Sequence, residues 1–283
     1  MEILAPAKLN LTLDVLGKRQ DGYHDMKMVM QSITLADRVK LSFGEDKELR
    51  VYSNLTFLPN DEKNLAGKAA VCFYKTLGKD LPGLTIRLDK DIPVCAGMAG
   101  GSSDAAAVLR GLNQLEGEPF SNLELARVGE QVGSDVPYCV LGCTALAEGR
   151  GEVLTPLPAL PACWVVVCKP EFSISTPELF ARIDSCKVRH RPDTDGVLAA
   201  LEAGDLSGVA RRMYNVFEDV LPERQRARVS DIKNVLIQCE ALGANMSGTG
   251  PSCFGLFDRE EGAKEAVTRL SEQYKETFLA RTV

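Results

Sequence analysis

The chain has 283 residues, of which 45% are hydrophobic and 25% are charged, the composition of a globular protein that can bury a sizeable core. Its formal net charge of −6 comes from acidic and basic residues scattered along the chain, so we expect neither a nucleic-acid partner nor a membrane partner. No run approaches the roughly 18 apolar residues of a membrane-spanning helix, and no basic region followed by a long apolar one suggests secretion, so a cytoplasmic protein is expected.

The nine cysteines are odd in number, irregularly spaced and mostly placed in apolar runs such as 163–168. No CxxC pair occurs, so neither a disulfide framework nor a structural zinc site is favoured. We therefore expect reduced cysteines that belong to the core.

The first predicted element is a strand over 8–17, "KLNLTLDVLG", in which polar and apolar residues alternate strictly. A period of two is typical of a half-buried strand, and it places Lys8 and Asn10 together on the polar face. The apolar spacing over 65–77 predicts a helix, and "LTIRLD" at 84–89 predicts another strand. The chain is therefore of mixed α and β type.

The segment 92–113, "IPVCAGMAGGSSDAAAVLRGLN", places small residues before an apolar pattern with helical spacing. We expect a helix to begin here, with Ser102 or Ser103 as its N-cap. Exposed amides and the positive end of the helix dipole suit an anion such as phosphate. The segment is neither a Walker A loop nor GxGxxG, so on local grounds a packing turn is an equal alternative.

Asp135 follows a predicted helix over 122–133, and Pro137 makes a helix interior unfavourable directly after it. We expect this carboxylate in a loop or at an element end, where it could hold a substrate hydroxyl or a metal, or simply cap a turn. For Lys8, too, two interpretations stay open, a surface lysine or a charge partner. A lysine close to Asp135 would keep that carboxylate ionised and stabilise developing alkoxide charge.

Three prolines within 151–164 indicate a linker, so we predict two domains, 1–155 and 156–283. The second half predicts a buried strand at 163–169, helices around 195–214 and 228–242, and a glycine-rich turn, "SGTGPS". A strand, "CFGLF", and a last helix from about Glu260 follow the turn. This order indicates a second α/β unit.

Tyr23 and His24 stand in "DGYHDM", directly after an Asp-Gly turn signal. An aromatic ring and an imidazole could stack on a nucleotide base and hydrogen-bond to it. The alternative is that both residues cover an edge of the core.

Five segments in this order, "APAKLNLTLDVLGKRQDGYHDM", 92–113, "GSDVPY", "ALAEGRGE" and "SGTGPSCFG", resemble the GHMP kinases nearly end to end. The resemblance implies an α/β (α+β) fold of two domains, a ribosomal-protein-S5-like N-terminal domain and a ferredoxin-like C-terminal domain, with the active site in the cleft between them. It implies that ATP, with Mg²⁺, phosphorylates the 2-hydroxyl of 4-diphosphocytidyl-2-C-methyl-D-erythritol in the non-mevalonate isoprenoid pathway. A monomer or weak homodimer is expected.

The resemblance also assigns roles by position. Asp135 corresponds to the catalytic base and Lys8 to its charge partner. The ATP phosphate loop comprises Pro93, Val94, Cys95, Ala96, Gly97, Met98, Ala99, Gly100, Gly101, Ser102 and Ser103.

Further positions would bind the base and sugar parts of the two substrates. Ser102 or Ser103 is expected to reach Mg²⁺, and Asn64 and Lys90 match the adenine side. The substrate-binding positions are Asn10, Thr176, Tyr23 and His24 at the cytosine, and Phe180 as the second aromatic wall of that stack.

Three positions of the phosphate loop depart from the family pattern, namely Cys95, Met98 and Ala99. Because such a loop binds through backbone amides, these small or apolar changes are compatible with phosphate binding. Cys95 adds a possible target for thiol reagents.

Two alternative functions stay open beside the expected one. A GHMP kinase for homoserine, mevalonate or a sugar has no evident use for Tyr23 and His24. A nucleotide-binding regulator without catalysis would need the phosphate loop, but neither Lys8 nor Asp135.

Overall fold

The structure, a computed structural model, describes residues 1–188 and 190–283. It divides into two compact units, each made of several chain segments. The first unit contains 1–7, 36–94 and 99–142, and the second unit contains 8–35, 95–98 and 143–283. Strands β1 (Glu2–Lys18) and β2 (His24–Phe43) both pass from one unit into the other. Each of the two predicted domains, 1–155 and 156–283, is one continuous stretch of chain, unlike these units. That division stays a prediction.

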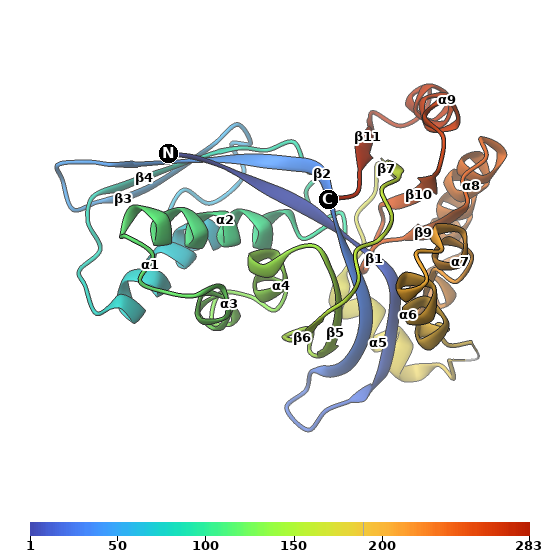
Figure 1. The fold of residues 1–283 in the computed structure, drawn as a ribbon, viewed down its shortest axis with the longest axis horizontal. Helices are drawn as coiled ribbons and strands as arrows, with labels where there is room; N and C mark the ends of the chain where they lie inside the picture. The colour runs from blue at the N-terminus through green and yellow to red at the C-terminus, as the bar shows by residue number, and fades with distance from the viewer. Residues whose placement is uncertain (189) are drawn as a thin grey trace. The chain divides into compact units, whose positions relative to one another are not determined.

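The first unit combines a small sheet with four helices (Figure 1). Strand β4 (Leu84–Asp89) pairs antiparallel with the end of β2 and parallel with β3 (Leu49–Ser53). The helices are α1 (Leu65–Leu77), α2 (Gly100–Leu115), α3 (Asn122–Glu130) and α4 (Val136–Leu141). Their apolar faces are buried, which gives this unit its own core.

The predicted helix over 65–77 is confirmed, whereas the predicted start of the next helix is wrong. Helix α2 begins at Gly100, and its N-cap is Ala99, not Ser102 or Ser103. Both serines lie inside the helix because the glycines before them already adopt helical geometry. The Ser103 hydroxyl instead donates to the carbonyl oxygen of Pro6 at 2.6 Å.

The second unit contains the remaining parts of β1 and β2. Strand β8 (Tyr214–Asn215) runs parallel to β1, β5 (Thr144–Gly149) pairs with β2, and β6 (Val153–Pro156) pairs with β5. The prediction that β1 exposes its polar face is wrong, because that face is also buried. Its buried polar residues are Lys8, Asn10, Thr12 and Asp14.

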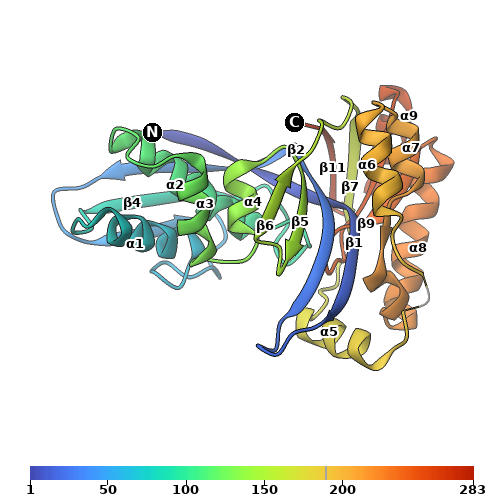
Figure 2. The ribbon, with the colours of Figure 1, turned by 60° about the horizontal axis from the view of Figure 1, so that its bottom comes forward.

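A second sheet of four strands, in the order β11-β7-β10-β9, belongs entirely to the second unit. All its pairings are antiparallel, and α8 and α9 pack on it (Figure 2). The elements that form this layer follow the chain order β7, α8, β9, β10, α9, β11, which is the ferredoxin-like arrangement. Their bounds are β7 Trp164–Lys169, α8 Glu223–Gln238, β9 Gly243–Met246, β10 Cys253–Phe257, α9 Glu260–Ser271 and β11 Glu276–Arg281.

Between β7 and α8 the chain inserts further helices. They are α5 (Thr176–Ser185), α6 (Thr194–Glu202), α7 (Leu206–Arg211) and the 3₁₀ helix η1 (Val216–Val220). The helix predicted around 195–214 is thus two helices, and the one predicted around 228–242 starts and ends earlier. The strands at 163–169 and 253–257 and the helix from Glu260 are confirmed.

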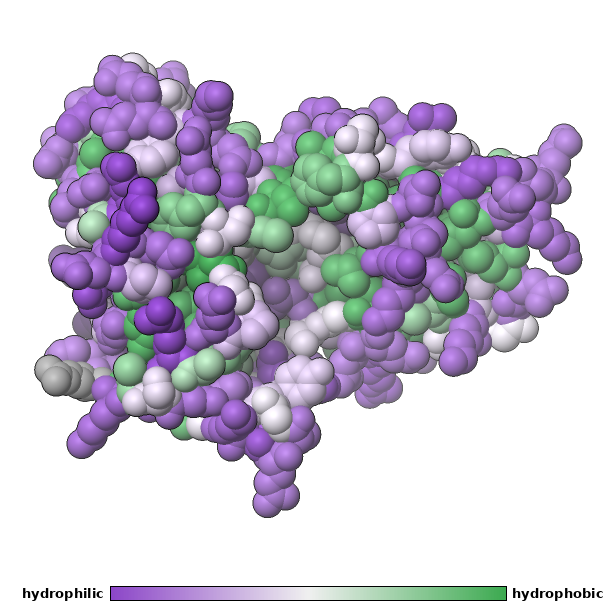
Figure 3. Space-filling model, turned by 180° about the vertical axis from the view of Figure 1, so that it is seen from behind, coloured by the Kyte–Doolittle hydropathy of each residue, from purple (hydrophilic) through white to green (hydrophobic). Residues whose placement is uncertain are grey.

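Hydrophilic side chains surround smaller apolar groups on the face drawn in Figure 3. None of the nine cysteines, all of which lie in the described residues, forms a disulfide bond, but the prediction that they belong to the core is only partly right, since Cys95, Cys143 and Cys186 are exposed. Burial raises the pKa of the Cys163 and Cys168 thiols to about 12. Within 1–188 and 190–283, no helix is long and apolar enough to cross a membrane.

Candidate active site

The tip of the predicted phosphate loop, residues 95–98, lies against the glycine-rich turn at 247–250 within the second unit. A Cβ on Gly97, whose φ is +74°, would lie 2.1 Å from the carbonyl oxygen of Ser247. A Cβ on Gly248, whose φ is +57°, would lie 2.8 Å from the carbonyl oxygen of Gly97. The two loops therefore touch backbone to backbone, which only glycine permits at these positions.

Hydrogen bonds fix this pair of loops to β1. The Ser247 hydroxyl donates to the Gly97 carbonyl oxygen at 2.9 Å and accepts from the Asn10 amide at 3.2 Å. The Lys8 amide donates to the carbonyl oxygen of Met98 at 3.2 Å. The glycine-rich segments that sequence analysis marked separately thus form one structure.

Asn215, which the sequence analysis missed, holds the second of these loops. Its buried side-chain amide donates to the carbonyl oxygens of Met246 and Gly248, both at 2.8 Å. The only local signal is a polar amide in the apolar run "YNVF". Buried carbonyl groups require such donors, so Asn215 stabilises the loop conformation.

Beyond its tip, the loop leads directly into α2. Cys95 and Ala99 have φ angles of 53° and 57°, the left-handed conformation that side chains normally disfavour. The 16-residue helix that follows directs its first amides and the positive end of its dipole towards the loop. Triphosphate binding by this segment stays a prediction.

The two serines predicted to reach Mg²⁺ differ in their surroundings. Ser103 is fully buried, and its hydroxyl is already bonded to Pro6, whereas Ser102 is half-buried in the first turn of α2. The residues that the structure describes include no group of three or more His, Cys, Asp or Glu side chains suited to a metal. Mg²⁺ commonly needs only one or two protein ligands beside phosphates and water, so Ser102 fits this role better.

Lys8 is 4% exposed, so the alternative of a surface lysine is wrong. Its ammonium group donates to the Asn10 side-chain oxygen at 2.6 Å. The side-chain nitrogen of Asn10 in turn donates to the Met28 sulfur at 3.3 Å. A buried ammonium group is unfavourable without such partners. Asn10 therefore orients Lys8 in addition to its predicted role at the substrate.

Asp135 occupies the N-cap position of α4, in agreement with its predicted place at an element end. Its side chain makes no capping hydrogen bond, although aspartate is among the preferred N-cap residues. The alternative that Asp135 simply caps a helix is therefore not supported. Asp135 belongs to the first unit and Lys8 to the second, so their pairing stays a prediction.

The predicted cytosine-binding residues lie together in the second unit. The rings of His24 and Phe180 stack on each other with centroids 4.4 Å apart, so they form one block instead of two walls around a slot. Tyr23 is 54% exposed, and the Arg150 guanidinium lies 5.2 Å from its ring centroid. Tyr23 is thus the most exposed of the three rings.

Asp184, which the sequence analysis did not single out, fixes His24. Its carboxylate lies 2.7 Å from the His24 Nε2 atom and accepts a bond from Lys18 at 3.1 Å. These two partners hold the pKa of Asp184 below its usual value. With Nε2 engaged, a ligand can meet only Nδ1 and the ring of His24.

Thr176 begins helix α5 within the second unit, and its exposed hydroxyl lies 3.0 Å from that of Thr249. Thr249 belongs to the same glycine-rich turn that contacts the phosphate loop. Thr176 is therefore placed beside this turn, and its substrate role stays a prediction.

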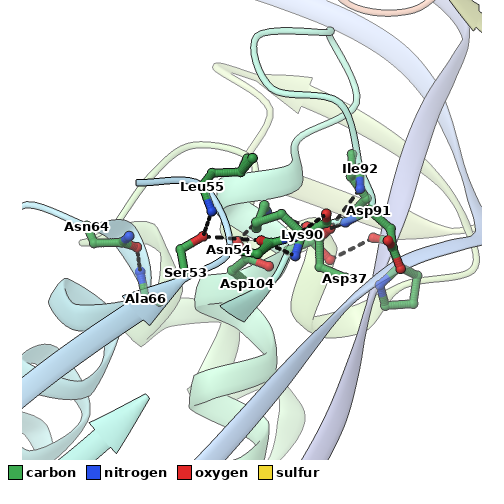
Figure 4. Close-up of polar contacts among 12 residues, drawn as sticks. Asp37, Ser53, Asn54, Leu55, Asn64, Ala66, Lys90, Asp91, Ile92 and Asp104 are labelled. Carbon is green, nitrogen blue, oxygen red and sulfur yellow. Dashed lines mark hydrogen bonds and ion pairs between the residues drawn. The ribbon is translucent and has the colours of Figure 1, made fainter. Parts of the chain in front are cut away.

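The side chains of Asn64 and Lys90 are engaged inside the first unit. Asn64 caps α1 by accepting from the Ala66 amide at 3.0 Å. The Lys90 ammonium is only 3% exposed and pairs with both Asp37 and Asp104, as Figure 4 shows. Burial raises the pKa of Asp104, and the Lys90 charge opposes this rise. Adenine contacts by Asn64 and Lys90 stay predictions.

Comparison with known proteins identifies the family. Residues 64–143 match the GHMP kinases N terminal domain, and residues 197–276 match the GHMP kinases C terminal domain. A 4-diphosphocytidyl-2-C-methyl-D-erythritol kinase of Alkaliphilus metalliredigens is 42% identical over 100% of this chain and 96% of its own length. The corresponding kinase of Clostridium tetani is 41% identical, with 100% of both chains covered.

Solved structures agree with this result. A crystal structure of a 4-(cytidine 5'-diphospho)-2C-methyl-D-erythritol kinase is 31% identical, has a TM-score of 0.82, and covers 100% of this chain and 99% of its own. A homoserine kinase from Cytophaga hutchinsonii is 20% identical with a TM-score of 0.79, covering 100% and 94%, and shares the fold. The chain therefore belongs to the GHMP kinase family of ATP-dependent kinases, in the branch whose relatives are the 4-diphosphocytidyl-2-C-methyl-D-erythritol kinases.

Proposed function

We propose that this protein transfers the γ-phosphoryl group of ATP to the 2-hydroxyl of 4-diphosphocytidyl-2-C-methyl-D-erythritol, giving the 2-phosphate and ADP. The observation that carries the proposal is identity of 41–42% along the whole chain with kinases named for this substrate. The geometry of the phosphate loop, and that of His24 with its neighbours Phe180 and Asp184, is consistent with it. Isoprenoid precursor synthesis is then the pathway served.

The phosphate loop and α2 would bind the triphosphate. Phosphoryl transfer asks a protein chiefly to position the reactants and neutralise phosphate charge. Backbone amides around residues 97–101 and the α2 dipole supply fixed partial positive charge. Mg²⁺, when bound with ATP, adds the charge neutralisation that this loop lacks without a Walker lysine, and Ser102 would hold it.

Asp135 would accept the proton of the attacking hydroxyl, and Lys8 would stabilise the charge that develops on the oxygen. Supporting observations are that Asp135 does not cap its own helix and that Lys8 is held buried by Asn10. A buried ammonium ion near a carboxylate favours the ionised base. This pair is what separates a kinase from a regulator that only binds nucleotide.

The cytosine of the substrate would stack on Tyr23 and hydrogen-bond to His24, whose ring Asp184 and Phe180 hold in place. Stacking on an aromatic ring suits a flat base, and a fixed imidazole adds directional recognition. An aliphatic alcohol such as homoserine or mevalonate would leave these groups unused.

The deciding assay measures ADP release with Mg-ATP and a panel of acceptors: 4-diphosphocytidyl-2-C-methyl-D-erythritol, homoserine, mevalonate and galactose. We expect release with the first acceptor alone. Preference for another acceptor would indicate a different GHMP kinase, and no release with any of them would indicate a regulator.

The role of Asp135 is tested by the Asp135→Asn variant, which keeps the size of the side chain but removes the base. We expect turnover to fall by about 10²-fold or more, with nucleotide affinity retained. The matched control is Asp80→Asn, an exposed carboxylate of the same unit, which should leave turnover unchanged. Near-normal turnover of Asp135→Asn would reject the assignment.

A further inference from the structure

The phosphate loop is flanked by a buried network of charges in the first unit (Figure 4). Lys90 stands just before the loop, and Asp104 lies in α2 just after it. The Lys90 ammonium pairs with Asp104, so one side chain links the entry of the loop to its exit. Asp37, from β2, pairs with the same ammonium.

Asp37 also fixes the backbone that enters the loop. Its second carboxylate oxygen accepts the amides of Asp91 at 2.6 Å and Ile92 at 2.7 Å. The side chain of Asn54 bonds both the amide of Lys90, at 2.9 Å, and its carbonyl oxygen, at 3.2 Å. Three successive peptide groups are thus immobilised before the loop begins.

The helix that leaves the loop packs tightly on this network. A Cβ on Gly100 would lie 3.2 Å from Ile92 and 3.4 Å from the Lys90 ammonium nitrogen. The first turn of α2, which supplies the phosphate-binding amides, therefore rests on Lys90 and Ile92. A displacement of Lys90 would be transmitted to those amides directly.

A contribution to stability does not by itself explain why these charged residues are buried together. Two carboxylates and one ammonium group are buried together, and the Asp104 Oδ1 atom is buried without a hydrogen-bond partner among the described residues. Apolar side chains of similar volume commonly stabilise a core more than such groups, whose desolvation opposes their attraction. A network of this kind has value where it selects one geometry over others.

We propose that Asp37, Lys90 and Asp104 are positioning residues that hold the two ends of the phosphate loop in the geometry that binds the ATP phosphates. This inference rests on the proposed function only in that the loop binds ATP. It does not depend on the identity of the alcohol acceptor. Lys90 then acts through the loop, and not as the adenine contact that its sequence position suggested.

The first test compares two substitutions at Asp104, with the Mg²⁺ complex of the non-hydrolysable ATP analogue AMP-PNP as ligand in calorimetric titrations. Asp104→Asn retains an oxygen for Lys90 and should bind within about threefold of the wild type. Asp104→Ala removes the link and should raise the Kd about tenfold or more, since small displacements of binding groups are costly. A normal Kd in folded Asp104→Ala protein would overturn the proposal.

The second test separates positioning from a direct adenine contact. Lys90→Met should also raise the Kd about tenfold, while Lys40→Met, which changes an exposed lysine paired with Asp89 in the same unit, should not. In the double variant of Lys90→Met and Asp104→Ala the two effects should not add, because both break one link. Additive effects would contradict the proposal.

Two further measurements guard against trivial outcomes. Thermal melting shows whether each variant is folded at the titration temperature. If Asp104→Ala does not fold, Asp37→Asn replaces it, because Asp37 uses both of its oxygens and an asparagine there cannot serve Lys90 and the amides of Asp91 and Ile92 together. A normal Kd of Asp37→Asn would again contradict the proposal. In turnover, the KM for ATP should rise while that for the alcohol stays within about twofold. If no acceptor is phosphorylated but the Kd pattern holds, only the proposed function fails.

Discussion

The tip of the phosphate loop and its flank are held by opposite means. At the tip, Gly97 and Gly248 bring two backbones into direct contact, and one small side chain, that of Ser247, adds a hydrogen bond to the Gly97 carbonyl oxygen. At the flank, charged side chains from β2, α2 and the residue that follows β4 meet in a buried cluster. The tip requires glycines at the two contact positions, whereas the flank requires charged residues that are distant from one another in the sequence.

The largest effect is expected when a side chain is restored at the tip. Gly97→Ala would place a Cβ 2.1 Å from the Ser247 carbonyl oxygen, so one backbone must move. We expect a loss of about 3 kcal/mol in unfolding free energy and of about 10²-fold in kcat/KM. Chemical denaturation and steady-state kinetics measure the two losses.

The control for Gly97→Ala separates the contact from the backbone conformation. Gly78 has nearly the same φ, +72°, but a Cβ there would meet nothing within 4 Å. Gly78→Ala should therefore lose only about 1 kcal/mol and leave kcat/KM unchanged. Equal losses in both variants would mean that backbone contact does not distinguish the tip.

This contrast explains what could be predicted from the sequence. The small residues of 92–104 lie next to one another, so their unusual composition is visible locally and indicates both the loop and the helix after it. The network of Asp37, Lys90 and Asp104 has no local pattern, because its members are separated by 53 and 14 residues. The burial of the polar face of β1 was missed for the same reason, since the side chains that contact it, such as Met28 at Asn10 and Arg191 at Asp14, come from distant parts of the sequence.

The tip also carries an exposed thiol, and chemical modification offers a second way to test it. Cys95 is exposed, whereas Cys163 and Cys168 are buried with thiol pKa values of about 12, so they stay protonated at pH 8. Iodoacetamide at this pH should label Cys95 and spare the buried pair, as mass spectrometry would show. The added group should reduce activity about tenfold or more, because it obstructs the loop.

The cysteine experiment has its own internal comparison. Cys95→Ser protein should keep its activity under the same treatment, whereas Cys186→Ser protein, which lacks another exposed thiol, should be inactivated like the wild type. Full activity of wild-type protein labelled at Cys95 would show that the tip tolerates bulk there.

The turn that meets the tip depends on Asn215, so an intermediate effect is expected from its removal. Asn215→Ala leaves the carbonyl groups of Met246 and Gly248 without their side-chain donor, at a loss of about 2 kcal/mol in unfolding free energy. Exposed Asn60→Ala should change this energy by less than about 0.5 kcal/mol. An Asn215→Ala protein as stable as the wild type would indicate that backbone packing alone holds the turn.

The smallest effect concerns Ala99, where the tip joins α2. Its left-handed conformation, with φ 57° and ψ 30°, is unfavourable for alanine by about 1 kcal/mol, and glycine would relieve it. Glycine also increases the entropy of the unfolded chain, which offsets about 0.4–1 kcal/mol of that gain. Ala99→Gly should therefore leave the unfolding free energy unchanged or raise it by up to about 0.5 kcal/mol.

The same substitution within a regular helix should have the opposite sign. Ala227 is exposed in the first half of α8, and Ala227→Gly should lower the unfolding free energy by about 1 kcal/mol. The difference between the two variants, about 1 kcal/mol or more, isolates the strain at Ala99 from the general effect of glycine. If Ala99→Gly destabilises the protein as much as Ala227→Gly does, the junction is unstrained. The buried network of Asp37, Lys90 and Asp104 then holds the loop without opposing backbone strain at Ala99.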